Sequence, residues 1–357
     1  MMNWIKTPGT LWLWLIAFSI YAQNHTSATH DTITVVAVGD IMLGTNYPKG
    51  YLPPGNDCHP LLADVKSILR DADLTFGNLE GSFSNEPEKH AKPCSSPRWC
   101  YRFSMPEKYV ECLTGAGFDV MNIANNHIHD LRAHGKNNTM KVLDRAGLHY
   151  AGVCAKPVDT FTVNGVKWGV CGFAPNSGTC SINDYKQMEN TVRRLKKECD
   201  MVLVSFHGGA EGSKYQHVPR KTEYFLGQNR GNVYEFAHRA IDAGADLVIG
   251  HGPHVTRAVE LYKNKLIAYS LGNFCTYRRF NLQGPNGIAP ILKIYLDPSG
   301  NLIKARIFPV YQDKMKGTFL DPQKRVIYKI KTLTQSDFPE TPLKITDDGW
   351  IIPENKD

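Results

Sequence analysis

Residues 32–40 read TITVVAVGD, a run of β-branched and small apolar side chains that ends in a glycine and an aspartate. A strand with one solvent-facing side would alternate apolar and polar residues, whereas this run is apolar almost throughout. We therefore predict a strand buried on both faces, as in the sheet of an α/β protein. Asp40 stands at its end, where such sheets place functional side chains.

Further runs along the chain alternate between strand-like and helix-like patterns. Apolar spacing predicts helices over 59–72, 106–117, 137–147, 184–200 and 231–245. Strands are predicted over 73–80, 118–127, 201–209 and 246–254, and hairpins over 161–174, 257–274 and 291–310. Since we find no internal repeat and no linker before about residue 310, one α/β domain over 33–310 accounts for this pattern, with a C-terminal extension over 311–357.

The composition is that of an ordinary globular protein. Of the 357 residues, 42% are hydrophobic and 21% are charged. The formal charge is +7, but basic and acidic residues are interspersed and form no basic stripe. A nucleic-acid partner is therefore not expected, whereas attraction to an anionic polymer stays open.

The first residues carry the pattern of an export signal. Lys6 precedes an apolar run from Leu11 to Ala22, which is about a dozen residues, whereas a membrane-spanning helix needs about 20. The small Ala22 fits cleavage before Gln23. We therefore predict a signal peptide over 1–22 and export to the periplasm or the cell surface. The alternative is an uncleaved anchor, which would hold the protein at the membrane.

Export makes disulfides available to the nine cysteines. Cys94 and Cys100 lie in one short loop, and Cys171 and Cys180 bracket another, so each pair is a candidate disulfide. No two cysteines have the C-x-x-C spacing of a structural zinc site. The odd number leaves at least one thiol free.

Polar side chains follow the predicted strands. They are Asp40, Asn78, Glu80, Asn125, Asn126, His127, Asp130, His207, His251 and His254. Each has a simpler explanation when taken alone: Asp40 and Asn126 as turn residues, Glu80 as a solvated acid, His207 as a hydrogen-bonded core histidine. Their recurrence at successive strand ends favours one shared site, because ligands of α/β sheets lie beyond the carboxyl ends of the strands.

The stretch GHGPH, residues 250–254, is the least easily explained by packing. It places two histidines on a Gly-Pro bend directly after an apolar run. Few cores need that arrangement, whereas a metal site would use both imidazoles. Pro253 would fix the bend, and Gly250 and Gly252 would let the backbone approach an ion closely.

Six motifs occur in an order that is typical of a known family: VGDIMLG, FGNLEG, NIANNHIHD, HGGAE, GHGPHV and YSLGNF. From about Ile33 to Phe274 the chain resembles the bacterial capsule-synthesis CapA family, also called the poly-γ-glutamate synthesis family, a branch of the calcineurin-type metallophosphoesterases. The resemblance implies an α/β fold built as a four-layer α/β/β/α sandwich around two mixed sheets.

The resemblance also implies a metal centre with one or two divalent ions of zinc, manganese or iron. The implied ligands are Asp40, Glu80, Asn126, His207, His251 and His254. His251 would serve the ion shared with Asn126 and His207, and His254 the other. His127 matches a histidine that acts as an acid or supports the ligands, and Asp130 would orient its ring. Glu211 is a supporting residue, a substrate contact or a surface residue.

Two positions depart from the superfamily pattern. Met42 stands where a histidine is usual, and Glu80 stands where an aspartate is usual. Both changes are usual in the CapA branch, but they leave a second ion with fewer ligands than the first.

The resemblance implies a secreted, metal-dependent hydrolase of capsule or surface-polymer metabolism. The bond cleaved would be a phosphoester or an amide, and the polymer poly-γ-glutamate or an exopolysaccharide. Its partners would be the anionic polymer or its precursor, together with other capsule-assembly proteins. The alternative is a non-catalytic surface component that binds an anionic polymer and keeps the metal site as a structural element.

Overall fold

The apolar run over 33–40 lies in β1 (Ile33–Met42), and both faces of this strand are buried. Val35 and Ala37 pack between two sheets, whereas Val36 and Val38 pack against helices. Successive side chains of a strand point to opposite faces, so an apolar run supplies both contacts at once. The prediction of a doubly buried strand is confirmed.

The computed structural model describes residues 1–2, 31–93 and 101–354. Most of the predicted signal peptide, residues 3–22, and the pair Cys94 and Cys100 lie outside the described residues. Within the described ranges, no helix combines the length and the apolar character that crossing a bilayer requires.

The first sheet contains ten strands and is mixed. Besides β1 they are β2 (Leu74–Leu79), β5 (Val120–Asn122), β6 (His149–Ala151), β15 (Asn273–Thr276), β16 (Ile288–Leu296), β17 (Leu302–Asp313), β18 (Gly317–Leu320), β19 (Leu343–Ile345) and β20 (Trp350–Pro353). Their order is β19-β20-β17-β16-β1-β2-β5-β6, with β15 beside β1 and β18 beside β17. The strands β2 and β15 run parallel to β1, and β16 runs antiparallel to it.

The second sheet contains six strands, in the order β13-β14-β12-β9-β8-β7. Their bounds are β7 (Val158–Val163), β8 (Val166–Phe173), β9 (Met201–His207), β12 (Leu247–His251), β13 (Val259–Tyr262) and β14 (Lys265–Ala268). The antiparallel pairs β7–β8 and β13–β14 are predicted hairpins, and so is β16–β17 in the first sheet. Two short ladders join β3 (Ser82–Phe83) to β4 (Ser104–Met105) and β10 (Tyr224–Phe225) to β11 (Gln228–Asn229).

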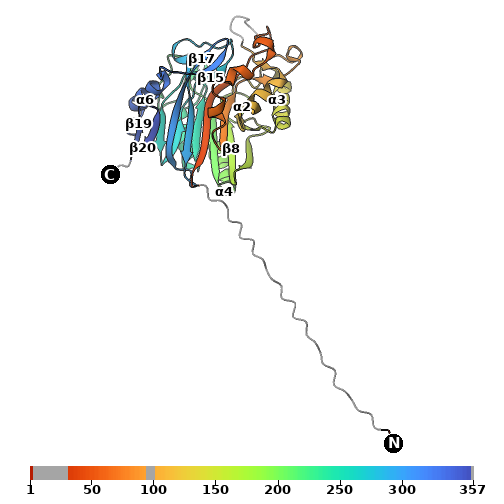
Figure 1. Cartoon of the computed structure of the whole chain (residues 1–357), viewed down its shortest axis with the longest axis vertical. Helices are drawn as coiled ribbons and strands as arrows, with labels where there is room; N and C mark the ends of the chain where they lie inside the picture. Colours follow the sequence, from red (N-terminus) through yellow and green to blue (C-terminus); the bar gives the residue numbers. More distant parts are fainter. Residues whose placement is uncertain (3–30, 94–100, 355–357) are drawn as a thin grey trace.

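Helices cover the outer face of each sheet, which gives the four layers α/β/β/α. The first sheet packs against α1 (Lys66–Leu69), α2 (Val110–Ala116) and α3 (Arg132–Ala146). The second packs against α4 (Tyr185–Glu198) and α5 (Val233–Asp242). A third apolar cluster, which includes Trp168, fills the space between the sheets. Figure 1 shows α2 and α3 together on one side of the sandwich.

The last part of the chain completes the first sheet. The expected boundary at residue 310 falls inside β17, and β20 pairs with that strand. The helix α6 (Arg325–Asp337) buries Ile327 and Ile330 in the cluster between the sheets. Figure 1 shows α6, β19 and β20 side by side at the edge of the molecule opposite α3.

Two local expectations differ from the structure. The helix predicted over 59–72 is divided into a 3-10 turn (His59–Leu62) and the short α1. The disulfide joins Cys58 to Cys112, whereas Cys171 and Cys180 are free thiols, so the pairing of Cys171 with Cys180 is wrong. The bonded pair is 54 residues apart in sequence and meets only where the 3-10 turn packs on α2.

Candidate metal centre

The six predicted ligands lie at strand ends from both sheets. In the first sheet, Asp40 lies near the end of β1, Glu80 directly follows β2, and Asn126 follows β5. In the second sheet, His207 and His251 end the neighbouring parallel strands β9 and β12 and stand opposite each other in register. His254 comes three residues after His251, on the bend. The parallel pairing explains why these distant residues meet at one edge.

Two glycines let the strand ends approach each other closely. A Cβ on Gly39 would lie 1.9 Å from the carbonyl oxygen of Gly272, which accepts the Asp40 N–H at 2.8 Å. A Cβ on Gly252, whose φ is +113°, would lie 2.7 Å from the carbonyl oxygen of Gly208. Only glycine fits such contacts, so these two positions let the end of β1 lie against Gly272 and the histidine-bearing bend lie against Gly208.

Asp40, Glu80 and His254 form a compact set of ligand-type side chains. The Nδ1 atom of His254 lies 3.0 Å from Oδ2 of Asp40, and its Nε2 atom lies 3.5 Å from Oε1 of Glu80. One ligand atom from each residue falls within 4.8 Å of the other two. A single cation between them can therefore contact all three.

His251 and His207 reach this set through Asp40 and Asn78. The Nδ1 atom of His251 lies 3.5 Å from Oδ1 of Asp40. The Asn78 amide nitrogen donates to the same oxygen at 2.8 Å and lies 3.5 Å from Nδ1 of His207. The two oxygens of Asp40 thus face different histidines, His251 on one side and His254 on the other.

Several buried ligand atoms at this centre have no hydrogen-bond partner within the described ranges. They are both carboxylate oxygens of Glu80, Nε2 of His207, both ring nitrogens of His251 and Oδ1 of Asn126. An unpartnered buried polar atom costs about 1–3 kcal/mol, so such atoms are rare. All of these atoms are ones that coordinate metals in proteins, so the residues fit a cation.

Burial shifts the pKa values of Glu80 and His207 in the direction that favours the neutral form of each side chain. Burial raises the pKa of Glu80 well above its usual range; His254 opposes this shift and Asp40 adds to it. Burial also lowers the pKa of His207 well below its usual range. A divalent cation would favour the ionised form of Glu80 and the neutral form of His207 together.

Asp40 and His254 are shifted in the opposite sense, because they contact each other. Burial alone would raise the pKa of Asp40, but its contacts with the imidazoles of His251 and His254 hold it well below its usual range. Burial acts downward on the pKa of His254, but Glu80 and Asp40 raise it to about 10. Asp40 is therefore ionised at neutral pH, which is the form in which a carboxylate binds a metal ion.

A series of buried asparagine side chains, linked by hydrogen bonds, ends at the carboxylate of Asp40. The Asn122 and Asn125 amide nitrogens donate to Oδ1 of Asn78 at 2.8 Å and 3.3 Å, and Asn78 in turn donates to Asp40. On the other side, Oδ1 of Asn273 lies 3.1 Å from Nδ1 of His254. The sequence alone assigned no role to Asn122 or Asn273. The motif YSLGNF did contain Asn273, and its place at a strand end was an available signal.

His127 and Asp130 lie together at the side of the centre. The Nδ1 atom of His127 is 2.6 Å from Oδ2 of Asp130, and its Nε2 atom is 3.9 Å from Oε1 of Glu80. Asp130 also accepts from the Lys92 ammonium and from the backbone N–H of Phe103. These contacts fix the ring so that its second nitrogen faces Glu80. Nothing in the sequence pointed to Lys92.

A pocket of about 520 Å³, here called the first hollow, opens beside His127, His254 and Asn126. Its wall carries the aromatic side chains Tyr101, Phe103, Phe225 and Phe280 and the cations Lys92, Arg230 and Arg279. Glu211 lies in this wall and pairs with Arg230 at 2.8 Å, and its charge adds to the upward shifts of the pKa values of Glu80 and His254. Met42 packs against Phe103 and Phe280. Met42 therefore supports the apolar side of the pocket.

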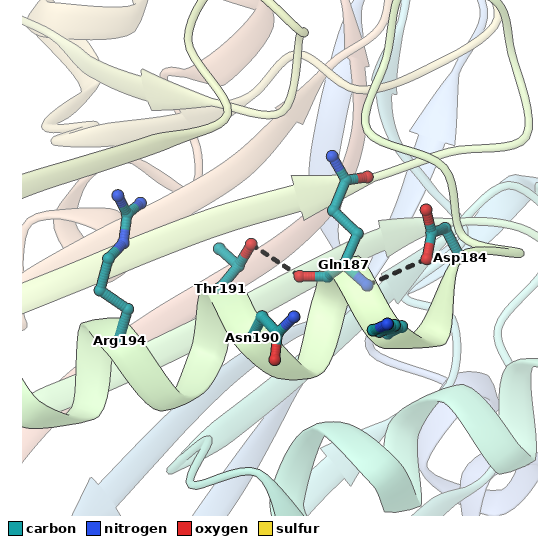
Figure 2. Close-up of a pocket in the computed structure, with 6 residues that line it drawn as sticks. Asp184, Gln187, Asn190, Thr191 and Arg194 are labelled. Carbon is teal, nitrogen blue, oxygen red and sulfur yellow. Dashed lines mark hydrogen bonds between the residues drawn. The ribbon is translucent and has the colours of Figure 1, made fainter.

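Two other polar groups do not make a comparable site. A hollow of about 530 Å³ lies along α4. Asp184 there accepts the Gln187 N–H at 2.9 Å, and Thr191 donates to the Gln187 carbonyl at 2.8 Å (Figure 2). These groups satisfy the helix itself. Asp57, His59 and Cys112 also lie close together, but the Cys112 sulfur is already bonded to Cys58.

Comparison with known proteins points to one family. The profile of the family described as bacterial capsule synthesis protein PGA_cap matches residues 34–278. The capsule biosynthesis protein CapA of Bacillus anthracis is 30% identical over 264 residues, which is 69% of this chain and 60% of that protein. The PGA biosynthesis protein CapA of Bacillus subtilis is 28% identical over 68% of this chain and 63% of its own length.

The chain thus spans less than two thirds of the length of these curated relatives. Among solved structures, the 5'-nucleotidase precursor of Thermus thermophilus aligns with a TM-score of 0.42 and 13% identity, over 85% of this chain and 59% of that one.

Proposed function

Because the chain belongs to the bacterial capsule synthesis protein PGA_cap family, we propose that it is a metal-dependent hydrolase of capsule or surface-polymer metabolism. The names of two relatives refer to capsule biosynthesis and to PGA biosynthesis. Poly-γ-glutamate, a polymer with one carboxylate and one amide bond per unit, is therefore the substrate that we propose first.

The observation that carries the proposal is the set of buried, unpartnered ligand atoms on Glu80, His207, His251 and Asn126 beside Asp40. Carboxylate, imidazole and amide oxygen together suit zinc, manganese or iron. Asp40 presents separate oxygens to His251 and His254, which suits a carboxylate that bridges two ions. When bound, such ions supply a nucleophilic water near neutral pH and stabilise negative charge on the attacked group.

The remaining chemistry falls to the side chains. In amide hydrolysis the hydroxyl of water bonds to the carbonyl carbon, the C–N bond breaks, and a proton passes to the leaving nitrogen. His127 lines the first hollow and is suited to deliver that proton from Nε2. Asp130 fixes the ring through Nδ1, and Lys92 fixes Asp130.

We also propose that the protein acts outside the cytoplasm, in contact with the polymer and with other capsule-assembly proteins. The Cys58–Cys112 disulfide supports export, because such bonds persist in oxidising compartments. The apolar run from Leu11 to Ala22 supports it from the sequence.

The test is a metal analysis followed by an assay on poly-γ-glutamate. We expect bound zinc, manganese or iron, and release of amino groups that stops on chelation and returns with one of these metals. His127→Gln should reduce the rate about 100-fold or more while the metal content stays unchanged. His238→Gln is the matched control, because His238 also pairs with a buried acid, Glu260, at 2.9 Å but lies outside the hollow.

The outcomes separate the two functions that the sequence left open. A metal-loaded protein that binds the polymer and releases no amino groups would be the non-catalytic surface component. A protein that retains no metal even after exposure to zinc and manganese would overturn the proposed centre. Equal losses of rate in His127→Gln and His238→Gln would remove the proton-donor role from His127.

A further inference from the structure

A second hollow of about 440 Å³ adjoins the first. It is lined by Asn125, Asn126, His129, Arg132, Ala133, Asn176 and Ser177. Two of these residues, Asn126 and Asn176, also line the first hollow. Asn126 in addition belongs to the candidate metal centre. A long molecule that lies in both hollows would therefore pass Asn126 and lie beside His127 and His254 in the first hollow.

We propose that the two hollows form one groove that binds an anionic, amide-linked polymer on both sides of the centre, with Arg132 holding the segment in the second hollow. The inference rests on the proposed function and specifies it further. The protein would then act within a chain and not at its end. Both volumes fall in the range of about 300–1,000 Å³ that is usual for ligand pockets, so each hollow can take several units.

Each hollow offers a guanidinium group that no acidic side chain of residues 31–93 or 101–354 neutralises. Arg279 stands in the first hollow near the rings of Tyr51 and Tyr101, 5.3 Å and 5.2 Å from their centres. Its Nε atom is buried and has no hydrogen-bond partner among the residues that the structure describes. Arg132 stands exposed in the second hollow. Such groups bind carboxylates through paired hydrogen bonds. The other two cations, Arg230 and Lys92, are already paired with acids.

The second hollow offers hydrogen-bond acceptors in addition to the charge of Arg132. Oδ1 of Asn176 and Nε2 of His129 are buried and have no hydrogen-bond partner within the described ranges. Both can accept from the N–H of an amide backbone, which a polyphosphate does not have. Arginines for carboxylates and acceptors for N–H groups together match a polymer such as poly-γ-glutamate.

The first test is binding as a function of chain length. Dissociation constants are measured for unlabelled poly-γ-glutamate oligomers, from the dimer to the long polymer, by calorimetry. We expect the affinity of the wild type to rise with length until both hollows are filled. Arg132→Glu should weaken the longest oligomers about tenfold or more and leave the shortest unchanged. Arg279→Glu should weaken all lengths.

Arg194→Glu is the matched control. Arg194 is exposed like Arg132 and lines the hollow on α4 in Figure 2, which has a similar volume but contacts no part of the centre. This variant should bind every oligomer as the wild type does. If Arg132→Glu and Arg194→Glu behave alike, or if Arg132→Glu weakens the shortest oligomers as much as the longest, the second hollow is not a binding site. Melting curves and a second variant, Arg132→Ala, exclude misfolding as the cause.

The second test is the size of the first products. A polymer held on both sides of the centre is cut internally, so the earliest products should be oligomers. Release of single glutamate units from the first time point would overturn the inference while leaving the hydrolase itself intact. A protein that cleaves no polymer fails the proposed function, and the length dependence of binding then still tests the groove.

Discussion

Gly252 should not tolerate even a methyl group, and Gly252→Ala measures what the bend contributes to the centre. A Cβ there would lie 2.7 Å from the carbonyl oxygen and 2.8 Å from the nitrogen of Gly208, and both are backbone atoms that cannot rotate away. Forcing alanine to a φ of +113° costs about 1–2 kcal/mol. Displacing the Gly208 backbone adds about 1–3 kcal/mol.

Gly212→Ala is the control that separates these two costs. Gly212 has a φ of +101°, but nothing lies within 4 Å of its would-be Cβ, so only the cost of φ applies. At about 2–4 °C per kcal/mol, metal-free Gly252→Ala should melt about 2–12 °C below metal-free Gly212→Ala in scanning fluorimetry. Because Gly252 separates His251 from His254, its variant should also retain less metal in elemental analysis. Equal melting temperatures and equal metal contents would refute the reasoning.

Further outcomes can be checked on single variants. His254→Ala should empty one ion site, and His251→Ala should weaken the site shared with Asn126 and His207. Both variants should still fold. An unchanged metal content in both, measured by elemental analysis, would return these histidines to a structural role. The next prediction concerns the ion pair of Asp321 with Arg325. Burial alone would raise the pKa of Asp321, but hydrogen bonds from Arg325 hold it below its usual range. The stability that Asp321 contributes is therefore present above the unfolded pKa of about 3.9 and is lost as pH falls through the lower folded value. Urea unfolding of Asp321→Asn should show a loss of about 1.5–3 kcal/mol at neutral pH that shrinks in acid, whereas a loss independent of pH would contradict the ionic contact. The Cys58–Cys112 disulfide joins residues 54 apart, which corresponds to about 4 kcal/mol of chain entropy in the unfolded state. Cys112→Ser should therefore lower the free energy of unfolding by up to about 4 kcal/mol. A melting temperature that does not change when reductant is added would contradict the bond.

The strands that are buried on both faces could be predicted from the sequence, because such strands are apolar along their whole length. β1, β2, β9 and β12 were found for that reason, and the polar residues at their ends became the candidate ligands. The helix α6 was missed, although Val326, Ile327, Ile330 and Leu333 recur at helical spacing and are buried. The strands β19 and β20 are short and half-exposed, and they become strands by pairing with a sheet that the local sequence does not reveal.

The same limit applies to the candidate centre. Residues at strand ends could be assigned because the carboxyl edge of a parallel sheet is a rule of topology. The contact of Lys92 with Asp130 joins residues 38 apart, and the pairing of Glu211 with Arg230 depends on the course of one long loop. The segments that carry Lys92, Glu211 and Arg230 have no periodic sequence pattern. Their partners could therefore not be predicted from the sequence and are seen only in the structure.

The contact between Asp40 and His254 joins residues 214 positions apart, and it has a consequence for the order of events during synthesis. A growing chain presents Asp40 early, but no histidine of the bend exists until two thirds of the protein has been made. A metal ion at the candidate centre would therefore lack its His254 ligand until that point of synthesis, and the centre can assemble only afterwards. If that folding takes place after export, the metals available in the outer compartment, and not those of the cytoplasm, decide which ion the protein carries.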